Sequence, residues 1–332
     1  MVTHCIYIYI FFLIIMIDIN LNILNAAIGS FADDTRMWDI INEVHKPHTL
    51  QQNLNTVYSW AETNNMEFND DKFEGIRFGH TNIAFEYHTP KGITITQNEN
   101  VKDLGIVFEQ SLLFSTHITN IVAKGHRTAG WALRVFKSRD TTTMLTLLKS
   151  LIISQVEYGC VLWSPLDTKH INLIERVQRQ FTSKMAKFQT YDQTLNMPVC
   201  STDYHERLRQ LKLYSLERRR DRYTIIYIYK KIIGLVPNPG LQYTENIRTG
   251  IVIKPKHDKH AARGTARIRN TSFFVKGPLM YNHLPSILRQ REYVTVPTKA
   301  QVEKFKKKLD SHLETIPDLP GTLANSLIPR TL

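Results

Sequence analysis

Two adjacent carboxylates between two mainly apolar runs constrain the fold of this chain more than any other stretch. The pair Asp33-Asp34 stands between the apolar runs 23–28 and 37–41. A β-hairpin satisfies this pattern, with a strand leading in, a tight turn carrying the acids, and a strand or helix leading out. Such a turn holds carboxylate oxygens rigidly, as Mg²⁺ prefers. Taken alone, however, an Asp-Asp pair is more often an exposed turn with two solvated acids.

The charge of the chain is divided unevenly along its length. The 332 residues carry a net charge of +12. Residues 1–123 contain 6 Lys and Arg against 14 Asp and Glu, whereas residues 124–332 contain 36 against 16. A C-terminal part this basic suggests a polyanionic partner, with nucleic acid as the first candidate. A solvated basic surface without a partner has the same composition.

The cysteine spacing favours an intracellular protein. Cys5, Cys160 and Cys200 are far apart and include no C-x-x-C pair. This pattern argues against a structural zinc site or a disulfide framework and fits a reducing compartment, with nucleus or cytoplasm left open. Cys160 and Cys200 are expected to be small packed side chains.

An apolar run of thirteen residues, 5–17, lies near the start of the chain. It is shorter than the roughly 20 residues that span a membrane. It also lacks the preceding positive charge and the cleavage site of a signal peptide. We therefore expect the segment 1–19 to be a buried strand, or residues from a gene-model boundary, rather than a membrane anchor or signal.

Hydrophobic periodicity divides the rest into a small α/β part and a helical part. A helix is predicted over 38–66, followed by short strands at 74–78, 83–87, 93–95 and 101–108. The last strand contains Gly105, which permits a bulge or a close approach by a ligand. Further helices are predicted at 117–137, 169–187, 205–234, 278–289 and 298–313, and another helix is predicted to begin after a cap at Asp140-Thr141. A basic loop and strand region is predicted at 254–269.

Several short motifs follow one another in a distinctive order and spacing. They include Ser30-Phe31-Ala32-Asp33-Asp34-Thr35, Trp60-Ala61-Glu62, Asp103-Leu104-Gly105-Ile106, Glu157-Tyr158-Gly159, Glu175-Arg176-Val177-Gln178-Arg179, Leu216-Glu217-Arg218-Arg219-Arg220 and Ser272-Phe273-Phe274. Together they resemble the C-terminal part of a reverse transcriptase from a jockey-like non-LTR retrotransposon, from about residue 17 to 320.

The resemblance implies an α+β fold with several regions. Residues 20–114 would be a partial polymerase palm, a small antiparallel sheet with a helix. Residues 115–235 would be a helical, thumb-like region, and residues 236–332 a basic C-terminal region. A polymerase of this kind needs metal-binding acids on a rigid turn and a basic thumb that holds a duplex by its backbone.

The resemblance also implies roles for individual residues. Asp33 and Asp34 would be the catalytic carboxylates that bind Mg²⁺ or Mn²⁺ for two-metal nucleotidyl transfer. Lys72 would bind the incoming nucleotide and neutralise charge on the leaving pyrophosphate, or it is an exposed turn lysine. Leu104 and Gly105 would contact the primer, or Gly105 is a simple bulge.

Basic and aromatic residues of the second part allow weaker inferences. The best candidates for phosphate contacts are Arg218, Arg219, Arg220 and Arg222, which Glu217 and Asp221 partly offset. Because His257, Asp258 and His260 lie among Lys and Arg, they favour a nucleic-acid-facing loop over a metal site. Trp60, Trp163 and Phe181 fall on apolar stripes and are expected in the core rather than stacked on bases.

The chain departs from the pattern of a working polymerase. The family uses a third carboxylate on a strand far upstream of the Asp pair, together with fingers residues that hold template and triphosphate. Here 32 residues precede Asp33, and their sole acid, Asp18, is a poor substitute. We therefore expect a reverse-transcriptase fragment, inactive alone, whose parent enzyme copies an RNA template from a DNA primer. The alternatives are a non-catalytic nucleic-acid-binding module derived from the thumb and a membrane-associated protein using residues 5–17.

Overall fold

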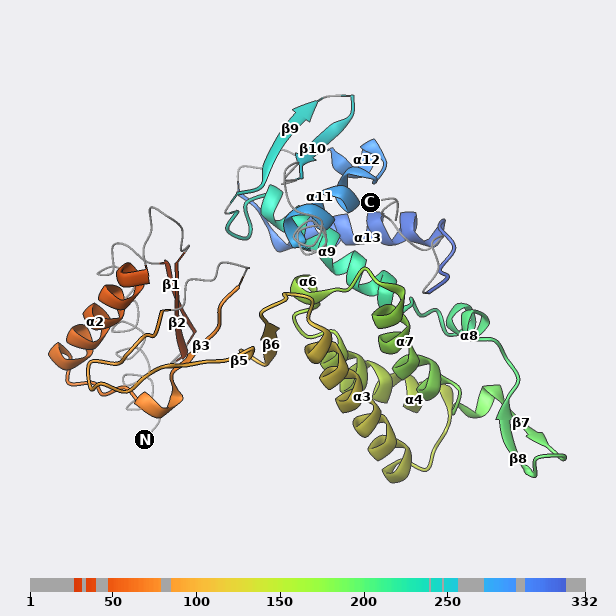
Figure 1. Cartoon of the computed structure of the whole chain (residues 1–332). Helices are drawn as coiled ribbons and strands as arrows, with labels where there is room; N and C mark the ends of the chain where they lie inside the picture. Colours follow the sequence, from red (N-terminus) through yellow and green to blue (C-terminus); the bar gives the residue numbers. More distant parts are fainter. Residues whose placement is uncertain are drawn as a thin grey trace, which may run out of the picture. The chain divides into compact units, whose positions relative to one another are not determined.

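The chain forms two compact units, residues 1–101 and 102–332 (Figure 1). The computed structural model describes residues 27–31, 34–39, 47–78, 85–238, 240–246, 248–255, 272–290 and 296–320. The described part is α+β, with many helices and with sheets of only two strands each. The apolar run 5–17 lies outside the described residues.

The first unit contains the predicted hairpin. Strand β1 (Ala27–Phe31) pairs antiparallel with β2 (Asp34–Trp38), and the register runs from Ala27 opposite Trp38 to Phe31 opposite Asp34. Two residues, Ala32 and Asp33, connect the strands. The chain therefore leaves the turn as a strand, which is one of the two continuations expected.

The helix predicted over 38–66 contains helix α2, which spans Pro47–Thr63. The predicted start is wrong, because Trp38 lies in β2 and pairs with β1, while residues 40–46 are outside the described residues. A proline suits the first position of a helix, where its missing N–H would lack a partner in any case. The buried face of α2 consists of Leu54, Val57, Tyr58 and Ala61.

The short strands after α2 are fewer and smaller than predicted. A 3-10 helix, η1 (Asp70–Lys72), leads into β3 (Glu74–Gly75), which pairs parallel with β4 (Thr96–Gln97). The prediction of strands at 83–87 and 93–95 is wrong for the residues that the structure describes. Residues 85–87 are irregular, and an isolated bridge joins His88 to Thr94.

The single strand predicted over 101–108 is also wrong. Strands β5 (Asn100–Asp103) and β6 (Ile106–Glu109) pair with each other across a tight turn at Leu104-Gly105. The φ angle is 46° at Leu104 and 83° at Gly105. Two successive residues with positive φ reverse the chain, as in the turns that close two-residue hairpins.

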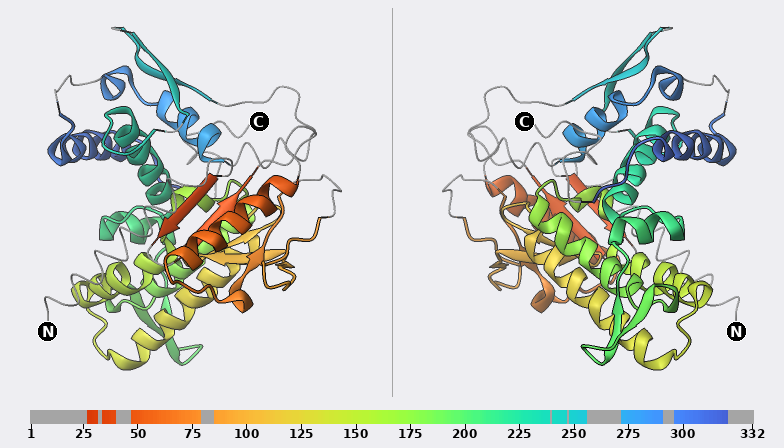
Figure 2. Two further views of the ribbon diagram at one scale, coloured as in Figure 1. Left: turned by 90° about the vertical axis from the view of Figure 1, so that its left-hand side faces the viewer. Right: turned by 90° about the vertical axis from the view of Figure 1, so that its right-hand side faces the viewer.

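The second unit begins with a helical layer around one hydrophobic core. Helices α3 (Ser115–Val135) and α7 (Thr168–Thr182) pack side by side (Figure 2). Between them in sequence lie α4 (Thr141–Leu147), the π-helical turn η2 (Leu148–Ile153), α5 (Ser154–Val156) and α6 (Cys160–Trp163). The predicted cap at Asp140 is confirmed, because its Oδ1 accepts a hydrogen bond from the Thr143 amide at 2.9 Å.

The helix predicted over 205–234 is two helices. Helix α8 (Tyr204–Leu211) ends where Lys212 takes a left-handed conformation with φ 51°. Helix α9 (Leu216–Ile232) then starts from the cap residue Ser215, whose Oγ accepts from the Arg218 amide at 3.0 Å. The Ser215 side chain thus accepts from a backbone N–H that would otherwise lack a partner at the helix start. This cap stabilises the beginning of a second helix soon after α8 ends.

A second core is built around the later part of α9. It contains β9 (Gln242–Asn246) and β10 (Gly250–Lys254), which pair antiparallel, and the helices α11 (Phe273–Asn282), α12 (Ser286–Arg289) and α13 (Lys299–Glu314). The helix predicted at 278–289 is therefore two helices, the first of which starts earlier and includes Pro278. The sequence prediction missed the β9–β10 hairpin, the 3-10 turn η3 (Ala186–Phe188) and the hairpin of β7 (Gln189–Asp192) with β8 (Met197–Cys200).

None of the helices in the described part of the chain combines the length and the apolar character needed to cross a bilayer.

Candidate functional site

Of the predicted catalytic pair, the structure describes one residue, and only by its backbone. Asp33 is outside the described residues. Asp34 is described by its backbone, as the first residue of β2. Among the side chains that the structure describes, no group of three His, Cys, Asp or Glu could hold a metal ion. The described residues thus do not form a metal centre, and no catalytic step can be derived through one.

Lys72 lies at the end of η1 and is exposed. The turn is fixed by its neighbours: the side chain of Asn69 accepts from the Asp71 amide at 3.2 Å, and Asp70 pairs with Lys91 at 3.3 Å. Tyr58 also donates to Asp70. This hydrogen bond is the main reason that the pKa of Asp70 is lowered. The structure therefore places Lys72 as a turn lysine that is open to a ligand.

The Leu104-Gly105 turn packs against the segment that connects α5 to α6. A Cβ atom added at Gly105 would lie 3.6 Å from Cε1 of Tyr158. The next residue, Ile106, is buried and lies against Gly159, where an added Cβ would come within 2.6 Å of its Cδ1. Gly105, one of the two residues predicted to contact a primer, thus lies beside the aromatic ring of Tyr158 in the turn between α5 and α6.

Two of the four predicted phosphate-binding arginines are half-buried and ion-paired. Arg219 donates from Nε and Nη2 to the two carboxylate oxygens of Glu157, at 2.7 and 2.8 Å. Arg222 makes a similar two-point contact with Asp310 on α13, with 2.7 Å between Nη2 and Oδ2. Such paired, planar contacts fix the guanidinium groups within the protein.

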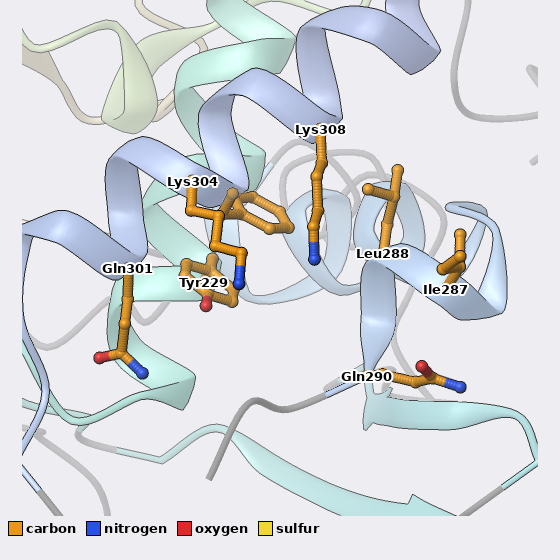
Figure 3. A pocket seen from close by; sticks show the side chains of 8 residues that line it. Tyr229, Ile287, Leu288, Gln290, Gln301, Lys304 and Lys308 are labelled. Carbon is orange, nitrogen blue, oxygen red and sulfur yellow. The ribbon is translucent and has the colours of Figure 1, made fainter. Parts of the chain in front are cut away.

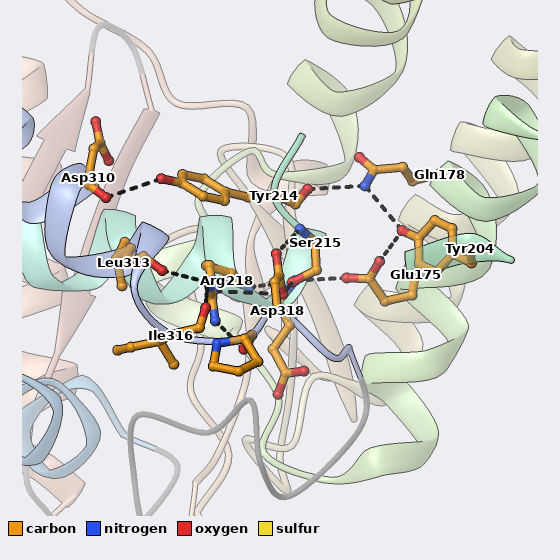
Figure 4. A network of polar contacts seen from close by, with 12 residues as sticks. Glu175, Gln178, Tyr204, Tyr214, Ser215, Arg218, Asp310, Leu313, Ile316 and Asp318 are labelled. Carbon is orange, nitrogen blue, oxygen red and sulfur yellow. Dashed lines mark hydrogen bonds and ion pairs between the residues drawn. The ribbon is translucent and has the colours of Figure 1, made fainter. Parts of the chain in front are cut away.

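Arg218 is buried and binds the segment that follows α13 (Figure 4). Its Nη1 donates to the carbonyls of Leu313 at 2.8 Å and Ile316 at 2.6 Å, and its Nη2 donates to that of Pro317 at 2.6 Å. Asp318 accepts from both the amide and the hydroxyl of Ser215 at 2.7 Å. The start of α9 is therefore tied to the end of the described chain.

Arg220 is 1% exposed, and its Nε and Nη1 have no hydrogen-bond partner in the described structure. Nearby, Lys276 pairs with Asp221 at 3.4 Å and donates to Ser164 at 3.0 Å. The first turns of α9 are accordingly an internal polar layer rather than an exposed basic face. The placement of the four arginines gives no support to the expected phosphate contacts, since their donors are buried or used within the chain.

A buried carboxyl adjoins this layer on α7. Glu175 is fully buried, and it accepts from the Tyr204 hydroxyl at 2.6 Å and from the Glu217 amide at 2.8 Å. Gln178 donates to the same hydroxyl and to the carbonyl of Tyr214, both at 3.1 Å (Figure 4). Burial raises the pKa of Glu175 to about 7, although the Tyr204 hydroxyl and the charge of Arg220 act in the opposite direction.

Part of the exposed positive charge of the second unit lies on the outer face of α3. Lys124, Arg127, Trp131 and Arg134 are all exposed and spaced by three or four residues, which places them on one face. Trp131 packs edge-to-face on Phe136, with 6.2 Å between ring centroids. The sequence analysis missed this face, although the absence of Asp and Glu from residues 115–139 signals it.

The expected core residues are mostly confirmed. Trp163 and Phe181 are buried in the first core, while Trp60 is partly buried and packs against Val57. Cys160 is buried, and this burial raises the pKa of its thiol to about 12. Cys200 is half-buried. His257, Asp258 and His260 lie outside the described residues.

A small pocket lies between α9, α12 and α13 (Figure 3). Its wall contains Tyr229 and Phe305, whose rings stack with 3.9 Å between centroids and 4° between planes. The other lining residues are Ile287, Leu288, Gln290, Gln301, Lys304 and Lys308. The residues predicted from sequence to form a site do not line this pocket.

Comparison with known proteins gives two significant relatives. The chain is 24% identical over 175 residues to the RNA-directed DNA polymerase from mobile element jockey of Drosophila melanogaster, an alignment that covers 51% of this chain and 19% of the relative. It is 26% identical over 133 residues to a probable RNA-directed DNA polymerase from transposon X-element of the same organism, covering 36% of this chain and 14% of the relative. The aligned part is thus less than a fifth of each polymerase.

Neither a protein-family model nor a solved structure matches the chain significantly. The resemblance to jockey-like non-LTR reverse transcriptases is nevertheless supported by both relatives, and the chain is similar to part of such a polymerase.

Proposed function

We propose that this chain is a segment of an RNA-directed DNA polymerase of a jockey-like non-LTR retrotransposon. The observation that carries the proposal is the β1–β2 hairpin, whose second strand begins at Asp34. The similarity to two polymerases of mobile elements supports the same reading. The hairpin would be the catalytic turn of a palm that continues to about residue 114, and residues 115–235 would be the thumb.

In the parent enzyme, this turn would take part in two-metal nucleotidyl transfer with Mg²⁺ or Mn²⁺. The metal ions would stabilise the attacking and leaving oxygens, and Asp33 and Asp34 would be their ligands. Lys72 would neutralise charge on the pyrophosphate, and the Leu104-Gly105 turn would support the primer. RNA template and DNA primer would be the substrates.

We further propose that the 332-residue chain does not polymerise by itself. Two carboxylates from a single turn leave a pair of metal ions with too few ligands. Loss of substrate positioning alone removes many powers of ten in rate.

The test is primer extension by the purified chain on a primed RNA template with Mg²⁺ or Mn²⁺. We expect no extension above a no-enzyme control. Extension that disappears in Asp33→Ala would contradict the proposed inactivity and would support the assignment of the catalytic turn.

The outer face of α3 favours a second function, nucleic-acid binding without catalysis. This face combines three exposed cations with an exposed indole, and the helix that carries it has no acidic residue. Cations that contact phosphates, together with an aromatic ring that stacks on bases, are the groups that bind nucleic acid independently of sequence.

Binding of a labelled RNA–DNA hybrid at several salt concentrations tests this function. The double variant Arg127→Ala/Arg134→Ala should bind more weakly and lower the salt slope by roughly 2, one unit for each lost phosphate contact. Lys299→Ala/Lys307→Ala removes the same charge from exposed positions of α13 and is the matched control. Equal losses in both variants would show a general charge effect and overturn the assignment to α3.

A further inference from the structure

We propose that Tyr158 is a stacking residue for a base of the nucleic-acid strand that crosses the Leu104-Gly105 turn. The proposal rests on the proposed function, which makes this turn a contact for the primer. It adds a residue for which the sequence analysis gave no role in binding.

The ring of Tyr158 lies beside the turn and is open to solvent. Its side chain is 56% exposed, and one of its ring carbons is 3.6 Å from the position that a Gly105 Cβ would take. Because Gly105 has no side chain, nothing from this residue covers the ring. A strand that approaches the turn would therefore meet an aromatic surface at the same place.

The backbone that carries Tyr158 is held firmly. Its carbonyl accepts from Nε1 of Trp163 at 2.8 Å, and Trp163 is 2% exposed. The Trp163 ring also packs edge-to-face on His117, whose Nδ1 accepts from the Val107 amide of β6 at 3.3 Å. The backbone of Tyr158 is thus anchored to a buried tryptophan and, through His117, to the strand that follows the turn. A residue whose backbone is fixed in this way loses less conformational freedom on binding.

The charges around the ring suit a polyanion. The preceding residue, Glu157, would repel phosphates, but its two carboxylate oxygens accept from Arg219. Lys102, two residues before the turn, is exposed. Asp103, which follows it, is half-buried. An exposed ring together with an exposed cation is the combination that binds the bases and backbone of a single strand. Leu162, 45% exposed on the following helical turn, adds an apolar contact for a base or sugar.

The hydroxyl of Tyr158 has no hydrogen-bond partner among the described residues. Stacking uses the ring face and not this hydroxyl, so phenylalanine should replace tyrosine without loss. This separates a stacking role from a role in hydrogen bonding.

The experiment measures binding of the full chain to an RNA–DNA hybrid with a short single-stranded end. Tyr158→Ala should weaken binding by roughly 5- to 100-fold, the range for loss of one base–aromatic stack. Tyr158→Phe should bind within about twofold of the wild type. Tyr191→Ala is the matched control, because Tyr191 is 64% exposed and lies on β7.

A second measurement uses the unaltered protein. 5-Iodouracil placed at successive positions near the end of the DNA strand should photo-crosslink to Tyr158 at one or two positions, as mapped by mass spectrometry. If the wild type binds the hybrid but Tyr158→Ala binds equally well and no crosslink forms, the stacking role is overturned while the proposed function stands. If the wild type does not bind the hybrid, the proposed nucleic-acid binding and the stacking role both fall.

Discussion

At the scale of single residues, Arg218 shows how a charged side chain can belong to the interior. Its guanidinium donates to three backbone carbonyls and lies 3.7 Å from Asp318. Arg218→Met keeps much of the volume but leaves these acceptors unsatisfied and Asp318 without its cation. We expect a loss of about 3–5 kcal/mol in the free energy of unfolding, measured by urea titration. Arg209→Met, which breaks an exposed pair with Glu206, should change it little, and equal losses would contradict this account.

Glu175 gives the chain a pH dependence of known sign. Its pKa is raised by burial from 4.5 to about 7, so the folded chain keeps a proton that the unfolded chain releases between these values. The contribution of this proton to the free energy of unfolding is fully present below pH 4.5. It is lost as the pH rises toward 7, by up to about 3 kcal/mol. Glu175→Gln imitates the neutral form and should lack this loss.

The measurement for Glu175 is a comparison of unfolding free energies at pH 5 and pH 8. The free energy of unfolding of Glu175→Gln, relative to the wild type, should rise by about 2.5 kcal/mol from pH 5 to pH 8. Taking this difference removes the contributions of other titrating groups. A difference that is the same at both values would show that Glu175 does not hold its proton.

The roles of such residues could not be predicted from sequence, because their partners are distant in the chain. Glu157 is 62 residues from Arg219, and Asp310 is 88 residues from Arg222. Local sequence shows only that Glu217 and Asp221 stand among the arginines. Burial and ion pairing depend on which helices meet α9, and periodicity within one helix does not contain that information.

At the scale of elements, Gly159 joins α5 and α6 and lets β6 dock. Its φ is 63°, and a Cβ there would lie 2.6 Å from Cδ1 of Ile106. Gly159→Ala should therefore suffer both backbone strain of about 1–2 kcal/mol and a clash of about 1–3 kcal/mol. Gly234→Ala is the control, since Gly234 has a φ of 82° but open space around it. Thermal unfolding of both variants measures the difference. Equal costs would show that Ile106 on β6 shifts to relieve the contact at no cost in stability.

The elements that could be predicted are those with local signals. The hairpin at the Asp pair, the cap at Asp140 and the long helices α3, α7 and α13 follow from adjacent residues and regular apolar spacing. The failures have a physical cause in the backbone. Leu104 and Lys212 adopt positive φ, which their side chains disfavour, so the sequence gives no sign of the β5–β6 turn or of the break before α9.

At the scale of the whole molecule, the candidate site could be predicted only in part from the sequence. The order of the motifs indicated a polymerase, and the comparisons support that resemblance. The exposed cations of α3 were not recognised, because net charge does not distinguish exposed from buried arginines. Of the basic residues of the second unit, those on α9 serve the interior and those on α3 face solvent.

Helix α9 connects the two cores of the second unit, and this determines how the unit should open. Leu216 at its start belongs to the first core, and Ile225 and the residues after it belong to the second. We predict that weakening either core loosens both. Ile174→Ala in the first core and Leu309→Ala in the second each remove a fully buried side chain, at a cost of about 2–5 kcal/mol. Hydrogen exchange of the full chain, followed by mass spectrometry, should show faster exchange throughout α9 and in peptides of both cores for either variant. Faster exchange confined to the altered core would mean that the cores are separate cooperative units and that α9 transmits no stability between them.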